Sequence, residues 1–143
     1  MPTVRDMVRK KGSEVYSTQP DASAYDALAL MAKHNTGALL VIAEGKIGGI
    51  LSERDCVRKL DLMGKTAKAT KVSEIMTSKV VYVEAAQELE ECMNIMIENN
   101  IRHLPVLDGS ELLGLISVRD VLKEVVDVQK QMIAQLEQYI TGG

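Results

Sequence analysis

Two segments of the chain end in the same set of polar residues. They read GILSERD, from Gly49 to Asp55, and GLISVRD, from Gly114 to Asp120. Each supplies a serine hydroxyl, an arginine guanidinium and an aspartate carboxylate at the same spacing. An arginine offers a fork of donors that suits phosphate, and a carboxylate can accept hydrogen bonds from two vicinal hydroxyls. The segments therefore predict two related sites for the phosphate and ribose of a nucleotide.

The same residues also predict a purely structural feature. A serine followed three residues later by an acid, just before an apolar helical run, forms a capping box at the start of a helix. Thr3 to Asp6 has this spacing too. A helix start presents free amides and the positive end of its dipole, so a cap can also hold an anion. Gly49 and Gly114 leave the preceding strand uncovered, where a flat ligand or another backbone can approach closely.

The two segments close two copies of a longer unit. A shift of 65 residues aligns Val15–Asp55 with Val80–Asp120 without a gap. The aligned pairs are identical at several positions and mostly keep their polarity elsewhere. Such agreement of pattern over a whole unit indicates an internal duplication.

Each unit reads as β-α-β-β-α. A short extended piece (15–18, 80–83) is followed by an amphipathic helix (22–35, 88–100), two strands (38–42 and 46–51, 103–109 and 111–116), and a helix that begins at Ser-x-x-Asp. One such unit is small for a stable core. We therefore expect an α+β protein in which the repeats pack sheet to sheet about a pseudo-two-fold axis, with equivalent positions facing a shared cleft.

The predicted organisation is one compact module with four parts. These are a first repeat over residues 1–62, a linker over 63–71, a second repeat over 72–125 and a C-terminal helix extension over 126–143.

Composition excludes several classes of function. The chain has no Phe or Trp, which argues against a base-stacking platform for single-stranded nucleic acid, and its net charge of −3 gives no general attraction to DNA or anionic membranes. No apolar run is long enough to span a bilayer. Cys56 and Cys92 fit small core residues, and with His34 and His103 they lack metal-site spacing. We expect a cytoplasmic protein with no metal, no catalytic residues and no nucleic-acid or membrane partner.

The motifs resemble a known family. The strand RHLPVLD (102–108), the closing segment GLISVRDVLK (114–123) and the tandem copy together look like a pair of cystathionine-β-synthase (CBS) domains, called a Bateman module. The resemblance covers nearly all of residues 1–140. It implies a regulatory module that binds an adenine nucleotide or derivative (AMP, ADP, ATP, NAD or S-adenosylmethionine) in the inter-repeat cleft and requires no cofactor.

The resemblance also implies roles for individual residues. Asp120 and Asp55 would each take a ribose diol, with serines at ribose or phosphate and arginines bordering it. The base would lie against the first strand of the opposite repeat. The implied contacts besides the two aspartates are Ser117, Arg119, Val15 and Tyr16 for the Asp120 site, and Ser52, Arg54, Thr77, Val80 and Val81 for the Asp55 site.

The repeats differ at one informative place. Arg102 and His103 stand where the first repeat has Gly37 and Ala38. The family that the chain resembles often has a basic residue just before this strand, so these two are the best candidates for phosphate contacts. Alternatively, His103 is a half-buried structural histidine. Two inequivalent sites follow, one rich in phosphate donors and one roomier and less charged.

The C-terminal segment predicts a long helix from Val118 to Ile140. Its apolar residues form two adjacent rows, too broad a face for a helix left in water. The rows contain Val121, Val125, Val128, Met132 and Tyr139, and Leu122, Val126, Ile133, Leu136 and Ile140. The helix either packs on its own module or docks against a second chain, and we favour a homodimer.

Three functions remain open from sequence. The leading one is a stand-alone regulatory module, not an enzyme, that responds to an adenine nucleotide through dimer or partner contacts with an unknown effector. The second is a nucleotide-processing enzyme that uses His103 as acid or base. The third is an interaction module whose clefts hold no ligand.

Overall fold

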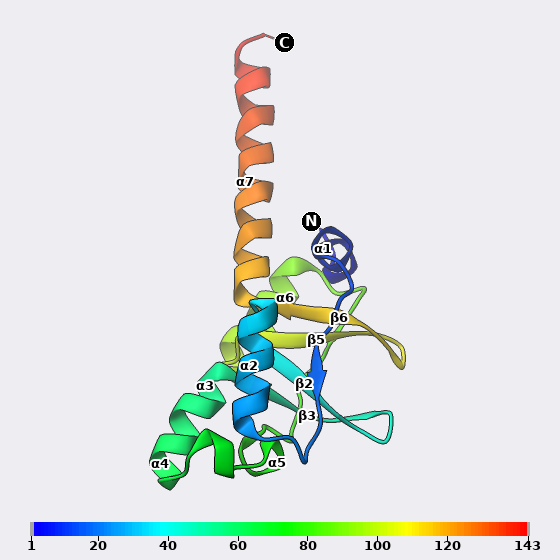
Figure 1. Ribbon diagram of the computed structural model, residues 1–143. Helices are drawn as coiled ribbons and strands as arrows, with labels where there is room; N and C mark the ends of the chain where they lie inside the picture. The colour runs from blue at the N-terminus through cyan, green and yellow to red at the C-terminus, as the bar shows by residue number, and fades with distance from the viewer. Residues whose placement is uncertain (1, 143) are drawn as a thin grey trace. The chain divides into compact units, whose positions relative to one another are not determined.

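The computed structural model describes residues 2–142, which form two compact units (Figure 1). Residues 15–80 make the first-repeat unit. Residues up to 14 and from 81 onward make the second-repeat unit.

The first-repeat unit is built on a three-stranded sheet. Its strands are β1 (Ser17–Thr18), β2 (Ala38–Ala43) and β3 (Lys46–Ser52), in the order β1-β2-β3, with β1 parallel and β3 antiparallel to β2. The hairpin turns at Glu44 and Gly45, whose φ angles of 52° and 75° match the twist of the flanking strands. The two hairpin strands and the turn are confirmed, whereas the predicted extended piece over 15–18 is a strand only at Ser17 and Thr18.

Helix α2 (Ala24–His34) covers this sheet. The Ser23 side chain accepts a hydrogen bond from the Asp26 amide, and Asn35 ends the helix in the left-handed conformation. Ala24, Ala27 and Met31 are buried, as the spacing predicts, whereas Ala32 is exposed because it lies at the edge of the apolar stripe.

The segment after β3 is helical from the predicted serine. It comprises α3 (Glu53–Asp55), the π-helical turn η1 (Cys56–Leu60), α4 (Asp61–Met63), the 3-10 turn η2 (Ala67–Ala69) and α5 (Val72–Ile75). Beyond α5, the Thr77 backbone bonds Ile50 of β3 in both directions, at 2.9 and 3.0 Å. Thr77 is thereby fixed beside the end of β3.

The second-repeat unit has the same topology. It contains α1 (Val4–Lys11), β4 (Val83–Glu84), α6 (Leu89–Asn99), β5 (His103–Asp108), β6 (Glu111–Ser117) and α7 (Val118–Ile140). The sheet order is β4-β5-β6, and its register repeats that of the first sheet: Val106 faces Gly114 as Val41 faces Gly49. The duplication inferred from sequence is thus present in the fold.

The N-terminal helix packs in the second-repeat unit. Val4, Met7 and Val8 of α1 are buried in a core with residues of α6, β5 and β6, and the Val4 amide bonds the Gln87 carbonyl. The predicted domain ranges count this helix with the first repeat, but its core contacts lie in the other unit. The sheet-to-sheet packing of the two units stays a prediction.

Both cysteines are core residues, as predicted. Cys56 and Cys92 are free thiols buried in the cores of the two different units. Burial raises the pKa of each thiol to about 11, so both stay protonated and unreactive near neutral pH.

Candidate functional site

The serine and aspartate of the second-repeat unit form a capping box at the start of α7. The Ser117 amide and hydroxyl donate to Asp120 Oδ2 at 2.7 and 2.9 Å, and the Asp120 amide donates to Ser117 Oγ at 3.2 Å. Because Ser117 is extended, β6 runs directly into the helix. The structural interpretation of the motif is confirmed here.

The same box closes the first-repeat sheet. The Ser52 amide donates to Asp55 Oδ2 at 3.1 Å, and the Asp55 amide donates to Ser52 Oγ at 3.0 Å. Thr3 and Asp6 make a third box at α1, where the intervening Arg5 pairs with Asp108 at 3.0 Å. Capping alone therefore does not distinguish the two candidate corners from an ordinary helix start.

A lysine lies on the second-repeat corner. Lys11 Nζ, at the end of α1, is 2.6 Å from Asp120 Oδ2 and also donates to the Leu115 carbonyl at 2.7 Å. Burial acts to raise the pKa of Asp120, but the bonds from Lys11 and Ser117 outweigh it, so the pKa is lowered and the carboxylate is ionised at neutral pH.

Sequence reasoning missed Lys11. The sequence did contain a signal: the 65-residue shift, continued upstream, aligns Lys11 with Met76, so the repeats differ in charge at this position.

The first-repeat corner has other neighbours. Thr77 Oγ1 lies 3.4 and 3.5 Å from the two oxygens of Asp55, so Thr77 is beside the corner to which it was assigned, and its contact with a ligand stays a prediction. Lys59 Nζ is 3.5 Å from Asp55 Oδ1 and donates to the Ile75 carbonyl at 2.8 Å. Hydrogen bonds of this length are weak, so these groups hold Asp55 loosely.

The two glycines are approached by the protein itself. A Cβ at Gly49 would lie 2.9 Å from the Thr77 carbonyl oxygen and 2.9 Å from the Met76 sulfur, and one at Gly114 would lie 3.1 Å from a methyl group of Val8. Of the two predicted uses, close approach of another segment of the chain is the one observed.

Arg102 and His103 begin β5 beside the second corner. Arg102 is exposed, and its carbonyl accepts from the Val118 amide at 2.9 Å. His103 is half-buried and faces Ser117 across the sheet. Burial, aided by the charges of Lys11 and Arg102, lowers the pKa of His103 to about 4 despite the opposing effect of Asp120. At neutral pH His103 is therefore a neutral donor or acceptor without positive charge.

Gly37 and Ala38 occupy the equivalent place in the first-repeat unit. The Gly37 carbonyl accepts from the Glu53 amide at 3.0 Å, matching the bond from Val118 to Arg102, and Ala38 faces Ser52. The backbone of the two corners is thus the same, and their side chains differ.

The remaining predicted contacts divide between the units. Val15, Tyr16, Arg54 and Val80 belong to the first-repeat unit, where the Tyr16 ring stacks on His34 at 3.7 Å between centroids. Val81 and the exposed Arg119 belong to the second-repeat unit. The pairings of Asp120 with Val15 and Tyr16, and of Asp55 with Val81, join different units and stay predictions.

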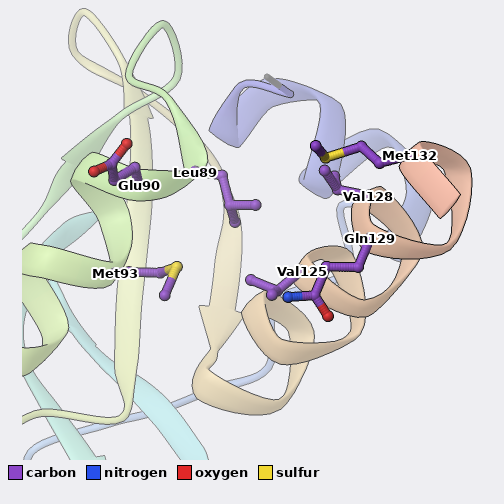
Figure 2. A pocket seen from close by; sticks show the side chains of 7 residues that line it. All are labelled: Leu89, Glu90, Met93, Val125, Val128, Gln129 and Met132. Carbon is purple, nitrogen blue, oxygen red and sulfur yellow. The ribbon is translucent and has the colours of Figure 1, made fainter. Parts of the chain in front are cut away.

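A groove of another kind lies between α6 and α7 (Figure 2). It measures about 380 Å³ and is mostly apolar. Its lining comprises Leu89, Glu90 and Met93 from α6 and Val125, Val128, Gln129 and Met132 from α7. With a carboxylate as its charged group, this groove does not suit a phosphate.

Within residues 2–142, no three histidine, cysteine, aspartate or glutamate side chains gather to hold a metal ion. None of the helices described is both long and apolar enough to cross a bilayer.

Two α+β repeats with the same topology and the same capped corner define a tandem-repeat module. The sequence model of the CBS domain matches residues 4–62 and 72–127, so the chain belongs to the CBS domain family. "CBS domain-containing protein CBSX3, mitochondrial" from Arabidopsis thaliana is 35% identical over 99% of this chain and 73% of its own length.

Solved structures agree with this assignment. A candidate signal-transduction protein with CBS domains from Burkholderia ambifaria MC40-6 is 46% identical with a TM-score of 0.85, over 87% of this chain and 94% of that one. A CBS-domain containing protein from Agrobacterium tumefaciens is 33% identical with a TM-score of 0.81, over 85% and 98%. The predicted family and the α+β fold with its long C-terminal helix are confirmed.

Proposed function

We propose that this CBS domain pair is a regulatory module that binds an adenine nucleotide or derivative (AMP, ADP, ATP or NAD) at its two capped corners. The observation that carries the proposal is the duplication of one arrangement at equivalent strand ends: β3 and β6 each carry a glycine three residues before a serine and run directly into a helix capped by Ser-x-Arg-Asp, which the capping box at α1 does not share. The Asp120 and Asp55 side chains are 21% and 17% exposed, so each is sheltered yet reachable.

The chemistry of each corner suits a nucleotide. The aspartate oxygens can accept hydrogen bonds from ribose hydroxyls, and the helix dipole favours a nearby phosphate. Arg102 would add charge to the second site, while His103, being neutral, would donate a single hydrogen bond. The Gly37–Ala38 corner would leave more room and less charge, and Val15, Tyr16, Val80 and Val81 would contact the bases.

A distant neighbour supports this class of ligand. A structure 22% identical to this chain is titled as a CBS domain pair in complex with 5′-methylthioadenosine and S-adenosyl-L-methionine. That likeness establishes the fold alone, and we propose the adenosine moiety for this chain from the chemistry of its corners.

The alternatives are weaker. An enzyme would need more than the single neutral imidazole of His103, and the match to an inosine-5′-monophosphate dehydrogenase from Methanocaldococcus jannaschii spans 21% of that enzyme. A ligand-free interaction module would use the two aspartates as helix caps but would have no need of an arginine beside each of them. The cytoplasmic location stays a prediction, and the Arabidopsis relative carries a mitochondrial name.

A thermal-shift panel tests the proposal. AMP, ADP, ATP, NAD and S-adenosylmethionine are compared with GMP and inorganic phosphate at rising concentrations. Binding to the native state raises the midpoint with concentration, by an amount set by the ratio of ligand to Kd. At least one adenine compound should raise it, and less so in Asp55→Asn/Asp120→Asn. No rise with any adenine compound contradicts the proposal, and product formation would favour the enzyme.

We also propose that a second copy of the chain covers α7. The part of α7 that packs on its own unit is limited: Val121 is buried, whereas Ile133 and Leu136 are 56% and 59% exposed. Beyond α1 and α6 of its own unit, the last turns of α7 continue alone (Figure 1). Packing of the helix on its own module, the other arrangement considered from sequence, therefore accounts only for the start of α7.

The exposed side chains of α7 have the order of a coiled-coil seam. Val126, Ile133 and Ile140 repeat every seven residues, and Leu122, Gln129 and Leu136 repeat between them. Lys130 and Glu137 flank the same side of this seam, where opposite charges meet if two copies run antiparallel. A CBS-CP12 protein 29% identical to this chain is titled as a hexamer.

A further inference from the structure

We propose that Lys11 is a latch on the second-repeat corner: it holds Asp120 in the ligand-free protein, and a ribose that uses both carboxylate oxygens must displace it. This inference rests on the proposed function, since it concerns the regulation of the same site.

The contacts at Asp120 carry the argument. Oδ2 receives the Ser117 amide at 2.7 Å, the Ser117 hydroxyl at 2.9 Å and Lys11 Nζ at 2.6 Å. A carboxylate offers about four lone-pair positions over its two oxygens, so three donors saturate one oxygen. A vicinal diol that binds both oxygens therefore competes with Lys11, because the Ser117 donors belong to the helix cap.

The first-repeat corner lacks this latch. Met76 stands at the position equivalent to Lys11, and its side chain lies against Gly49. Lys59 Nζ lies 3.5 Å from Asp55 Oδ1 and donates a shorter hydrogen bond, of 2.8 Å, to the Ile75 carbonyl. A diol therefore meets less competition at Asp55 than at Asp120. The two sites differ through Lys11 as well as through Arg102 and His103.

Displacement of Lys11 would be transmitted to α1. Lys11 is the last residue of this helix, and the preceding Lys10 holds Glu124 of α7 through both carboxylate oxygens, at 2.9 and 3.1 Å. Gly12 follows at a φ of 102°, a conformation that glycine adopts freely. Once Lys11 leaves Asp120, the end of α1 loses one tie to α7 while Lys10 keeps the other, so occupancy of the site alters the segment that joins α1 to β1.

The test uses adenosine, which has the ribose diol and no phosphate that Lys11 could bind instead. Titration calorimetry is done in an Asp55→Asn background, which leaves the Asp120 site to be measured. Lys11→Met installs the residue of the first repeat and should tighten adenosine binding about two- to fivefold, the scale of a partly exposed ion pair. The matched control is Arg9→Met, which removes an exposed positive charge from the same helix without touching Asp120 or Glu124 and should leave the affinity unchanged.

Amide hydrogen exchange supplies a second measurement. In wild-type protein, adenosine should speed the exchange of residues 9–12, and this response should vanish in Lys11→Met. Adenosine affinity that is unchanged or weaker in Lys11→Met contradicts the latch alone. Adenosine that binds no variant while AMP binds the wild-type protein contradicts the latch alone, because the ribose then does not compete with Lys11 for Asp120. Absence of binding by both compounds, in the Asp55 wild-type background too, contradicts the proposed function and the latch with it.

Discussion

The carboxylates of Asp55 and Asp120 each form part of a helix cap and are each proposed to bind a ligand. Each accepts a hydrogen bond from the amide of the serine that caps its helix, and each is proposed to accept hydrogen bonds from a ribose diol. The capping interpretation and the ligand interpretation of Ser-x-Arg-Asp are therefore compatible, since the cap fixes the carboxylate at the helix start. What separates the two corners is the set of side chains around them, chiefly Lys11 and His103 against Met76 and Ala38.

His103 should make stability depend on pH. Its pKa is about 4 in the folded protein against 6.5 ordinarily. As pH falls from 6.5 to 4, the unfolded chain binds a proton that the folded protein does not, so the free energy of unfolding falls. The upper limit of this loss is about 3 kcal/mol. Urea unfolding at pH 7.0, 5.5 and 4.5 should show a smaller loss in His103→Gln.

Protonation of Asp120 contributes little to the pH dependence of stability between pH 7.0 and 4.5. Its pKa is lowered from 3.8, so the stability it contributes is lost only as pH falls below that value. Equal pH dependence in wild-type protein and His103→Gln would show that the imidazole is not held neutral by burial.

At the scale of elements, the two repeats keep the same contacts with different chemistry. Four residues after each capping aspartate, a side chain contacts the helix that packs on the same unit. It is Lys59, which contacts α5, in the first-repeat unit and Glu124, which contacts α1, in the second, at equivalent positions. Lys59 donates to the Ile75 carbonyl, whereas Glu124 accepts from Lys10, and Ile75 and Lys10 are equivalent as well. The contact is therefore kept at equivalent positions, although the side chain is positive in the first-repeat unit and negative in the second.

Gly49→Ala should destabilise the first-repeat unit by about 1–3 kcal/mol. The added Cβ would lie 2.9 Å from the Thr77 carbonyl oxygen, and moving that backbone breaks its bonds with Ile50. At Gly48 the nearest atom to a new Cβ is the Val41 carbonyl oxygen, at an ordinary 3.8 Å. Gly48→Ala is therefore the matched control, and denaturant unfolding of both variants checks the difference. Equal stabilities would mean that Thr77 does not press on β3 as described.

The fold could be predicted from sequence wherever the information was local. The residues that define the short apolar strands, the Glu44–Gly45 turn and each serine cap lie close together in sequence, and the duplication supplied a second copy of each. The position of α1 depends on which core its apolar face meets, and the Lys11 contact joins residues 109 apart in sequence. No periodicity contains that information. His103 was a correct candidate for a half-buried residue, but its neutral state follows from burial that only the fold defines.

At the scale of the whole molecule, α7 should control assembly. Ile133→Asp/Leu136→Asp places charges in the exposed seam and should shift a dimer to monomers in size-exclusion chromatography with light scattering. Gln131→Asp/Gln138→Asp, on the opposite face of the same helix, should leave the dimer intact. A dimer that survives both pairs of changes would exclude α7 as the interface.

Charge reversal tests the direction of the helices. Lys130→Glu should weaken an antiparallel dimer and Lys130→Glu/Glu137→Lys should restore it, because the two positions meet across the seam in that arrangement. An equal effect of the single and double changes would contradict antiparallel pairing.

The most direct test of the central claim is titration calorimetry of the wild-type protein and of Asp55→Asn/Asp120→Asn with adenine nucleotides. Asparagine keeps an oxygen for the helix cap, so the variant isolates the charge and the second acceptor. We predict saturable binding of an adenine nucleotide to the wild-type protein that is weakened at least tenfold in the double variant. Binding of equal affinity in both proteins, or no heat with any adenine compound at millimolar concentration, would contradict the account.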